Sequence, residues 1–148
     1  MTEHSALHST FTLERVYPAT TGRAFAAWAD PASKFRWFAN PGDEHDLDFR
    51  PGGRESLLHH GKDGKPTLRF ESLYNDIVPD ERIVYSGTLF ADDRPATVSI
   101  TTVEFETSAE GTRLVLTEQG TFLDGLEEPA WREQGTADWL DKLTAELT

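Results

Sequence analysis

The chain has 148 residues and no cysteine, and its 26 acidic and 14 basic residues give a net charge of −12. This length suits one domain, so we expect residues 1–148 to form a single domain with a flexible N-terminus over residues 1–9. The absence of cysteine excludes both disulfides and thiol catalysis. The negative charge disfavours nucleic acid and anionic membrane surfaces as partners, because both would be repelled.

The sequence carries no recognisable targeting segment. The first ten residues lack the basic head and apolar run of a signal peptide. No segment reaches the roughly 20 consecutive apolar residues that span a bilayer. We therefore expect a cytoplasmic protein with no membrane contact.

The first elements predicted are a strand and two short helices. Residues 11–17 alternate apolar and polar side chains, as a strand with one buried face does. A helix over residues 22–29 follows, with Thr20 or Thr21 as its N-cap. Asp30 is a favoured N-cap and Pro31 is favoured at the first helical position, so a second short helix is expected from there.

From residue 46 onward the apolar pattern has the period of strands. Strands are expected over residues 46–50, 54–60, 68–78, 82–90, 96–107 and 112–119, separated by turns rich in Pro, Gly and Asp. Within the third of these, Asp76 and Val78 are expected to continue the face of Tyr74. Strands in uninterrupted succession favour an α+β fold with a curved antiparallel sheet of six to seven strands.

The C-terminal segment predicts one long amphipathic helix. Its apolar stripe repeats every four residues through Trp131, Gly135, Trp139, Leu143 and Leu147. Arg132 is expected outside that stripe. Gly135 costs roughly 1 kcal/mol of helix propensity, so we expect another element to approach closely there. Such a helix after a run of strands packs across their sheet, which predicts a helix grip with a hollow between the two.

Three segments resemble the SRPBCC (START/Bet v 1-like) superfamily. They are Asp-Phe-Arg-Pro-Gly-Gly-Arg at 48–54, Asp-Ile-Val-Pro-Asp-Glu-Arg-Ile-Val-Tyr at 76–85 and Gly-Thr-Arg-Leu-Val-Leu-Thr-Glu-Gln-Gly at 111–120. The chain is most similar to the branch named after the C-terminal domain of the activator of Hsp90 ATPase, in the same element order over residues 10–147. The resemblance implies a helix-grip fold with a cavity between the C-terminal helix and the concave face of the sheet.

The superfamily implies a cavity but no single activity, since its members include lipid and hormone binders, aromatase/cyclases, oxygenase domains and Hsp90 co-chaperones. We expect binding of a small hydrophobic or aromatic molecule, with no cofactor. One alternative is a cyclase or hydrolase-like enzyme acting on an aromatic or polyketide-like substrate. The other is an Hsp90-type co-chaperone module. The co-chaperone has an N-terminal domain for which this chain leaves no room, so we do not expect a chaperone partner.

Glu118 is the candidate catalytic residue. By strand parity it points the same way as Leu114 and Leu116, and so into the hollow if those two residues face the helix. A buried carboxylate can act as a general acid or base. The alternative is an ion-paired or hydrated carboxylate near the end of a strand.

Arg132 begins the long helix, where its guanidinium can reach Glu118 or a ligand carboxylate in bidentate fashion. The alternative is a surface charge pair with Glu133.

The histidines offer weaker signals. His59 and His60 are adjacent in a strand and point to opposite faces, so they cannot share a metal ion, and one of them is expected to face the cavity as a proton carrier. His45 lies among acidic residues without a known metal-loop spacing, so we expect no metal site.

The other candidate ligand-binding residues are mostly apolar or aromatic, and they are equally suited to core packing. They are Trp28, Phe38, Phe49, Leu57, Phe70, Tyr74, Tyr85, Leu116, Phe122, Gly135 and Trp139, with His59, Glu118 and Arg132 completing the set. The sequence leaves the oligomeric state open. A homodimer through a sheet face or edge would be two-fold symmetric, the commonest arrangement.

Overall fold

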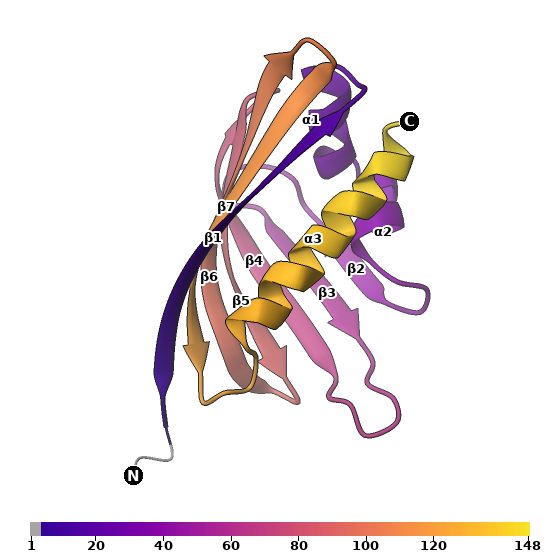
Figure 1. The fold of residues 1–148 in the computed structure, drawn as a ribbon. Coiled ribbons are helices and arrows are strands. Elements are labelled where there is room, and N and C mark those ends of the chain that lie inside the picture. Colours follow the sequence, from indigo (N-terminus) through magenta and orange to yellow (C-terminus); the bar gives the residue numbers. More distant parts are fainter. Residues whose placement is uncertain (1–3) are drawn as a thin grey trace.

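The computed structural model describes residues 4–148 and has one seven-stranded antiparallel sheet with three helices on its concave face (Figure 1). The elements are β1 (Ala6–Tyr17), α1 (Thr21–Ala29), α2 (Pro31–Phe38), β2 (Glu44–Leu47), β3 (Arg54–His59), β4 (Leu68–Val78), β5 (Arg82–Ala91), β6 (Arg94–Ser108), β7 (Gly111–Leu123) and α3 (Pro129–Glu146). The strand order is β1-β7-β6-β5-β4-β3-β2. The predicted α+β helix-grip fold is confirmed.

The α3 helix lies diagonally across the curved sheet, and α1 and α2 cover the end of the sheet near the C-terminus (Figure 1). The core fills the space between these layers. It includes Trp28 and Trp37 from the short helices, Leu114 and Leu116 from β7, and Leu140 from α3. None of the helices within residues 4–148 is long and apolar enough to cross a membrane.

The strand β1 is longer than predicted. Residues 6–9, which we expected to be flexible, pair with the end of β7, from Ala6 opposite Leu123 to Ser9 opposite Gly120. The rest of that expected flexible segment includes residues 1–3, which lie outside the described residues. The two strands extend together because each supplies the hydrogen-bonding partners of the other.

A β-bulge in β4 changes which side chains face the core. The register with β5 shifts between Tyr74 and Asp76, so the extra residue Asn75 reverses the alternation beyond it. Ile77 then packs against the core beside Ile83. The prediction that Asp76 and Val78 continue the face of Tyr74 is therefore wrong.

Side-chain caps begin the short helices as predicted. The Thr20 hydroxyl accepts a hydrogen bond from the backbone N–H of Arg23 at 3.2 Å, and the Asp30 carboxylate accepts one from the backbone N–H of Ser33 at 2.9 Å. Each cap satisfies an N–H group that has no partner within the helix. Together these caps fix where α1 and α2 begin.

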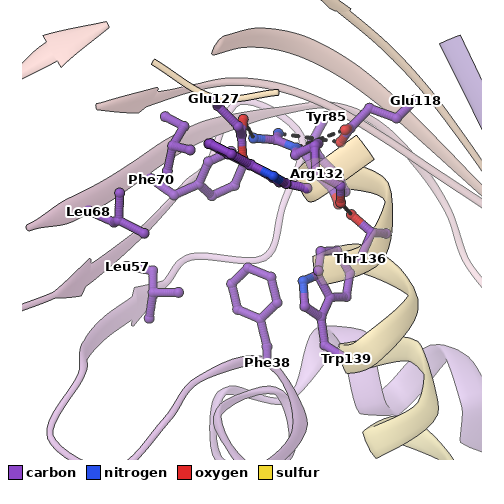
Figure 2. A pocket seen from close by; sticks show the side chains of 13 residues that line it. Phe38, Leu57, Leu68, Phe70, Tyr85, Glu118, Glu127, Arg132, Thr136 and Trp139 are labelled. Atoms are coloured by element: carbon purple, nitrogen blue, oxygen red, sulfur yellow. Dashed lines mark hydrogen bonds and ion pairs between the residues drawn. The ribbon is translucent and has the colours of Figure 1, made fainter. Parts of the chain in front are cut away.

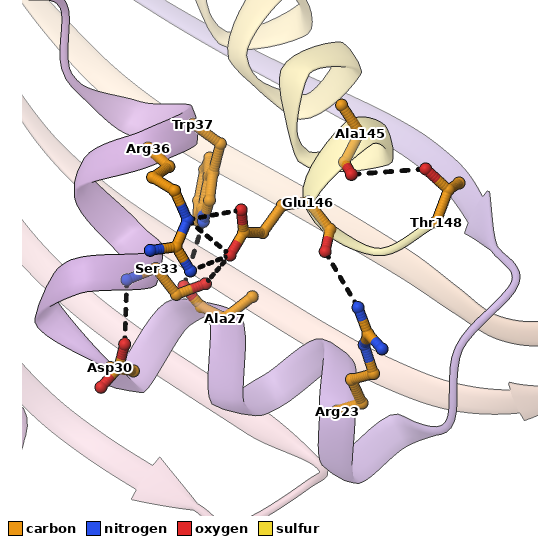
Figure 3. A network of polar contacts seen from close by, with 9 residues as sticks. All are labelled: Arg23, Ala27, Asp30, Ser33, Arg36, Trp37, Ala145, Glu146 and Thr148. Carbon is orange, nitrogen blue, oxygen red and sulfur yellow. Dashed lines mark hydrogen bonds and ion pairs between the residues drawn. The ribbon is translucent and has the colours of Figure 1, made fainter.

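One carboxylate fastens the end of α3 to α2 (Figure 3). Glu146 accepts hydrogen bonds from the Arg36 guanidinium, at 2.6 Å from Nη2, and from the Ser33 hydroxyl, also at 2.6 Å. The Arg36 guanidinium lowers the pKa of Glu146 below its usual value. The backbone oxygen of Glu146 also accepts a hydrogen bond from Arg23 in α1, at 3.1 Å. Both short helices are therefore tied to α3.

The inward face of α3 differs from the predicted stripe. It runs through Arg132, Thr136, Leu140, Leu143 and Leu147, whereas Trp131 is 60% exposed. At about 100° per residue, a four-residue spacing drifts, and positions 131 and 147 end about 160° apart around the helix. The stripe through these two positions therefore could not lie on one face, and the prediction that Arg132 lies outside the buried face is wrong.

Candidate ligand-binding cavity

A cavity of about 190 Å³ lies between α3 and the concave face of the sheet. Its lining is mostly apolar, with charged side chains at one end and aromatic rings at the other (Figure 2). The lining residues are Phe38, Leu57, Leu68, Phe70, Tyr85, Leu89, Glu118, Glu127, Trp131, Arg132, Gly135, Thr136 and Trp139.

The apolar wall is a row of side chains across three strands. Leu57 of β3 lies opposite Phe70 of β4, which lies opposite Leu89 of β5. Cross-strand partners point to the same face of a sheet, so the alternation within each strand brings these three together. Gly87 leaves room for the ring, since a Cβ there would lie 3.1 Å from Phe70 Cζ and 2.6 Å from the Glu71 carbonyl oxygen.

A second row brings polar groups to the cavity. Tyr74, Tyr85, Thr101 and Glu118 are successive cross-strand partners on β4, β5, β6 and β7. Glu118 is only 4% exposed, so the prediction from strand parity that it faces the interior is confirmed. Within this row, Tyr85 and Glu118 reach the cavity.

Arg132 connects this row to the helix. Its Nε donates to Glu118 Oε2 at 2.9 Å, and its Nη1 donates to Glu127 Oε1 at 3.2 Å. Its Nη2 donates to Ser99 Oγ at 3.0 Å and to Glu118 Oε1 at 3.4 Å. The predicted contact with Glu118 is present. The alternative, a surface pair with Glu133, does not describe this guanidinium, whose side chain is 11% exposed.

Two threonine hydroxyls complete the polar end. Thr101 donates to Glu118 Oε1 at 2.8 Å, and Thr97 donates to Glu127 Oε1 at 2.6 Å. Burial disfavours the charged form of Arg132, but Glu118 and Glu127 raise its pKa above the ordinary value. Arg132 therefore stays charged between its two carboxylates.

Tyr85 lies beside this group as a neutral hydroxyl. Burial raises the pKa of Tyr85 well above its usual value, and the negative charges of Glu118 and Glu55 raise it further. The phenol therefore offers a neutral hydroxyl at the cavity wall.

A second buried charged cluster lies behind the cavity, and sequence reasoning missed it. Glu55 of β3 accepts hydrogen bonds from Lys34 Nζ at 3.0 Å to each oxygen, from the Tyr74 hydroxyl at 2.7 Å and from His45 Nε2 at 2.7 Å. The Lys34 and Glu55 side chains are each 1% exposed. The cluster adjoins the cavity through Phe38, whose ring centroid is 4.5 Å from Lys34 Nζ.

Electrostatics keeps the Glu55 carboxyl ionised. Burial alone raises the pKa of Glu55, but Lys34 and hydrogen bonds from His45 and Tyr74 lower it to about 2. For Lys34, burial lowers the pKa against the opposing effect of Glu55. The Trp28 and Trp37 ring centroids lie 5.1 and 5.6 Å from its ammonium nitrogen, distances at which aromatic faces stabilise a cation.

Eight of the predicted site residues line the cavity: Phe38, Leu57, Phe70, Tyr85, Glu118, Arg132, Gly135 and Trp139. Six others lie elsewhere, among them His59, which hydrogen-bonds Asp43. Trp28 and Leu116 are in the core, Tyr74 donates to Glu55, and Phe49 packs edge-on against Phe25 and Tyr74. Phe122 is buried near the end of β7.

The predicted close approach at Gly135 is wrong. No heavy atom outside its immediate chain surroundings lies within 4 Å of a Cβ built on this residue. Gly135 instead leaves space at the helix surface, and that space belongs to the cavity. The missing side chain therefore enlarges the hollow.

No histidine is among the residues that line the cavity. His59, which shares its face with Leu57, hydrogen-bonds Asp43 at 2.7 Å, and His60 hydrogen-bonds Glu44 at 2.8 Å. His59 therefore lies on the cavity side of its strand, as expected for one of the two, but neither histidine lines the cavity. Within residues 4–148, no group of three His, Cys, Asp or Glu side chains is arranged to hold a metal ion.

Sequence reasoning also missed Leu68, Leu89, Glu127, Trp131 and Thr136 as lining residues. Leu68 shares the face of Phe70 by simple alternation, so parity could have found it. Glu127 lies between β7 and α3, where no periodicity applies. Its contact with Arg132 depends on how the chain turns there.

Comparisons with known proteins agree with this architecture. The sequence profile described as "Activator of Hsp90 ATPase homolog 1-like protein" matches residues 18–148. A crystal structure from Rhizobium loti is 45% identical, covers 97% of this chain and 99% of its own, and has a TM-score of 0.90. A structure from Rhizobium leguminosarum is 40% identical, covers 97% of each chain and has a TM-score of 0.92. A third, from Chromobacterium violaceum, is 26% identical, covers 93% of this chain and 96% of its own, and has a TM-score of 0.76. A comparison with curated proteins finds no match.

Proposed function

The chain belongs to the family of activator of Hsp90 ATPase homolog 1-like proteins, and from that premise we propose that it binds a small, mostly apolar molecule in the cavity between α3 and the sheet. The observation that carries the proposal is the lining. An apolar wall from Leu57, Phe70 and Leu89 faces α3, and a few polar groups gather at one end. A cavity with this combination is typical of small-molecule sites.

The size of the cavity supports a compact ligand. Cavities for drug-sized molecules measure about 300–1,000 Å³. The volume here is about 190 Å³. An apolar cavity of about 150 Å³ accommodates benzene, so this one suits a single ring with a short substituent. A sterol would require the cavity to open further.

The test is thermal unfolding with a panel of one-ring aromatic compounds and a sterol. A ligand at 100 times its dissociation constant stabilises the folded state by about 2.7 kcal/mol, if it binds only that state. For a domain of this size the midpoint would rise by roughly 5–10 °C. We expect such shifts with one-ring compounds and none with the sterol.

Gly135→Trp supplies the control, because the new side chain would occupy the free space at the cavity. Gln134→Trp adds the same side chain at an exposed neighbouring position. The ligand-induced shift should vanish in Gly135→Trp and persist in Gln134→Trp, with both variants folded. A shift that survives in Gly135→Trp would contradict binding in this cavity.

A further inference from the structure

We propose that the cavity selects ligands whose polar group donates hydrogen bonds, an amine above all, and discriminates against carboxylates. This inference rests on the proposed function and names the ligand class for the same site. It concerns the polar end of the cavity, formed by Glu118, Glu127 and Arg132.

The charges at this end do not balance. Two carboxylates, Glu118 and Glu127, face a single guanidinium, and both pair with it. The group therefore carries a net negative charge in a place with little exposure to water, since the three side chains are 5%, 15% and 11% exposed. A ligand cation would neutralise that charge, whereas a ligand anion would add to it.

The hydrogen-bonding groups at this end also favour a ligand that donates hydrogen bonds. A guanidinium has five N–H groups, and Arg132 uses four of them on Glu118, Glu127 and Ser99. The hydroxyls of Thr97 and Thr101 also donate to the two carboxylates. For a ligand carboxylate, the fifth N–H of Arg132 and the neutral Tyr85 hydroxyl remain at this end, beside two carboxylates that repel it.

Acceptors, by contrast, remain free. The hydrogen bonds from Thr97 and Arg132 to the Glu127 carboxylate both fall on Oε1, and among residues 4–148 no hydrogen-bond donor reaches its Oε2. A carboxylate oxygen offers two acceptor positions, so a ligand N–H or O–H can bind there without displacing a protein contact. The free oxygen belongs to a residue that lines the cavity.

The electrostatic potential around the polar end of the cavity is also negative. The charges of Glu118 and Glu55 add to the effect of burial in raising the pKa of Tyr85, which is the response of a phenol to negative potential. At the opposite end of the cavity, Phe38, Leu57 and Trp139 offer apolar and aromatic surface apart from the indole N–H of Trp139 (Figure 2). An aromatic ring with a short aminomethyl substituent matches both ends.

The experiment is an NMR titration of the wild-type protein with toluene, benzyl alcohol, benzylamine and phenylacetate. These compounds share a benzyl group and differ in the polar substituent. The indole N–H resonances of Trp131 and Trp139, both at the cavity, report binding. We expect benzylamine to bind more tightly than benzyl alcohol, and at least about tenfold more tightly than phenylacetate, because hydrogen bonds between charged groups are the stronger ones.

Two variants distinguish an effect of the cavity carboxylate from an effect of the protein's net charge. Glu127→Gln and Glu128→Gln each remove one negative charge, but Glu128 is exposed and does not line the cavity. The preference for benzylamine over phenylacetate should shrink strongly in Glu127→Gln and persist in Glu128→Gln. Toluene, which lacks the polar substituent, should still bind each of the three proteins, which shows that the cavity is intact.

Two results would overturn the inference while leaving the proposed function standing. One is phenylacetate binding as tightly as benzylamine, and the other is an equal loss of preference in both variants, which would assign it to the overall charge of the chain. If no compound, toluene included, shifts the indole resonances, the proposed function itself fails and the inference fails with it.

Discussion

Replacing Glu55 by glutamine removes one charge from the buried cluster behind the cavity while keeping the shape of the side chain. The carboxylate accepts hydrogen bonds from Lys34, His45 and Tyr74. An amide offers one acceptor oxygen and turns an NH₂ group toward the remaining donors. The Lys34 ammonium then stays buried without its counter-charge.

The expected cost follows from the burial of both partners. Removing one partner of a buried, hydrogen-bonded ion pair destabilises a protein by about 3–5 kcal/mol. The pKa of Glu55 indicates a similar free-energy cost. A drop from 4.5 in an exposed carboxyl to about 2 in the folded protein corresponds to on the order of 3 kcal/mol. Because domains are stable by about 5–15 kcal/mol, Glu55→Gln should still fold, with a midpoint lower by roughly 10 °C.

Chemical denaturation at neutral pH measures this cost, and a double-mutant cycle assigns it. Lys34→Met alone should also destabilise, because it leaves the Glu55 carboxylate buried without its cation. The double variant Lys34→Met/Glu55→Gln buries neither charge. It should therefore be at least about 2 kcal/mol more stable than the two single costs together predict.

The pH dependence supplies a second readout. The folded-state pKa of Glu55 is depressed, so its contribution to stability is fully present above about pH 4.5 and is lost as the pH falls toward 2. The difference in stability between wild type and Glu55→Gln should therefore narrow over this range. A cost below about 1 kcal/mol, or additive single variants, would refute the view that Lys34 and Glu55 form a coupled buried pair.

Two other substitutions test the packing of α3. Glu146→Gln should cost about 1 kcal/mol, because it weakens the charged hydrogen bonds from Arg36 and Ser33, and the loss should decrease in high salt; equal costs at low and high salt would contradict an ionic contribution. Trp131→Ala should change the free energy of unfolding by no more than about 0.5 kcal/mol, because the side chain is 60% exposed. It should nevertheless weaken toluene binding in the same NMR titration by roughly threefold, since this ring lines the cavity, and unchanged affinity would remove Trp131 from the site.

Local patterns in the sequence predicted the elements and the faces of most strands. The alternation around Leu114, Leu116 and Glu118 put all three on one face, and that face is buried, because the side-chain period of a strand is a property of neighbouring residues. The caps Thr20 and Asp30 were recognisable for the same reason, because each side chain accepts a hydrogen bond from a backbone N–H only three residues away.

Local patterns gave wrong faces in two situations. In one, a small angular error adds up over several helical turns, and in the other, the strand register shifts at a single residue. The bulge at Asn75 reversed the faces of β4 beyond it, and no signal in the alternation marked that position. On α3, a stripe read every four residues drifted away from the true buried face, so Arg132 was placed outside and Trp131 inside.

The element order, the shared face of Leu114, Leu116 and Glu118, and the supply of apolar side chains were determined by the sequence itself, since each depends on residues close together in the chain. Only the tertiary structure decided that Lys34 meets Glu55 across 21 positions, that Glu127 joins Glu118 at Arg132, and that Gly135 faces open space. Those contacts exist because α2 and α3 dock on the concave face at one particular depth and angle. That docking is set by the packing of the whole core, and no local spacing encodes it.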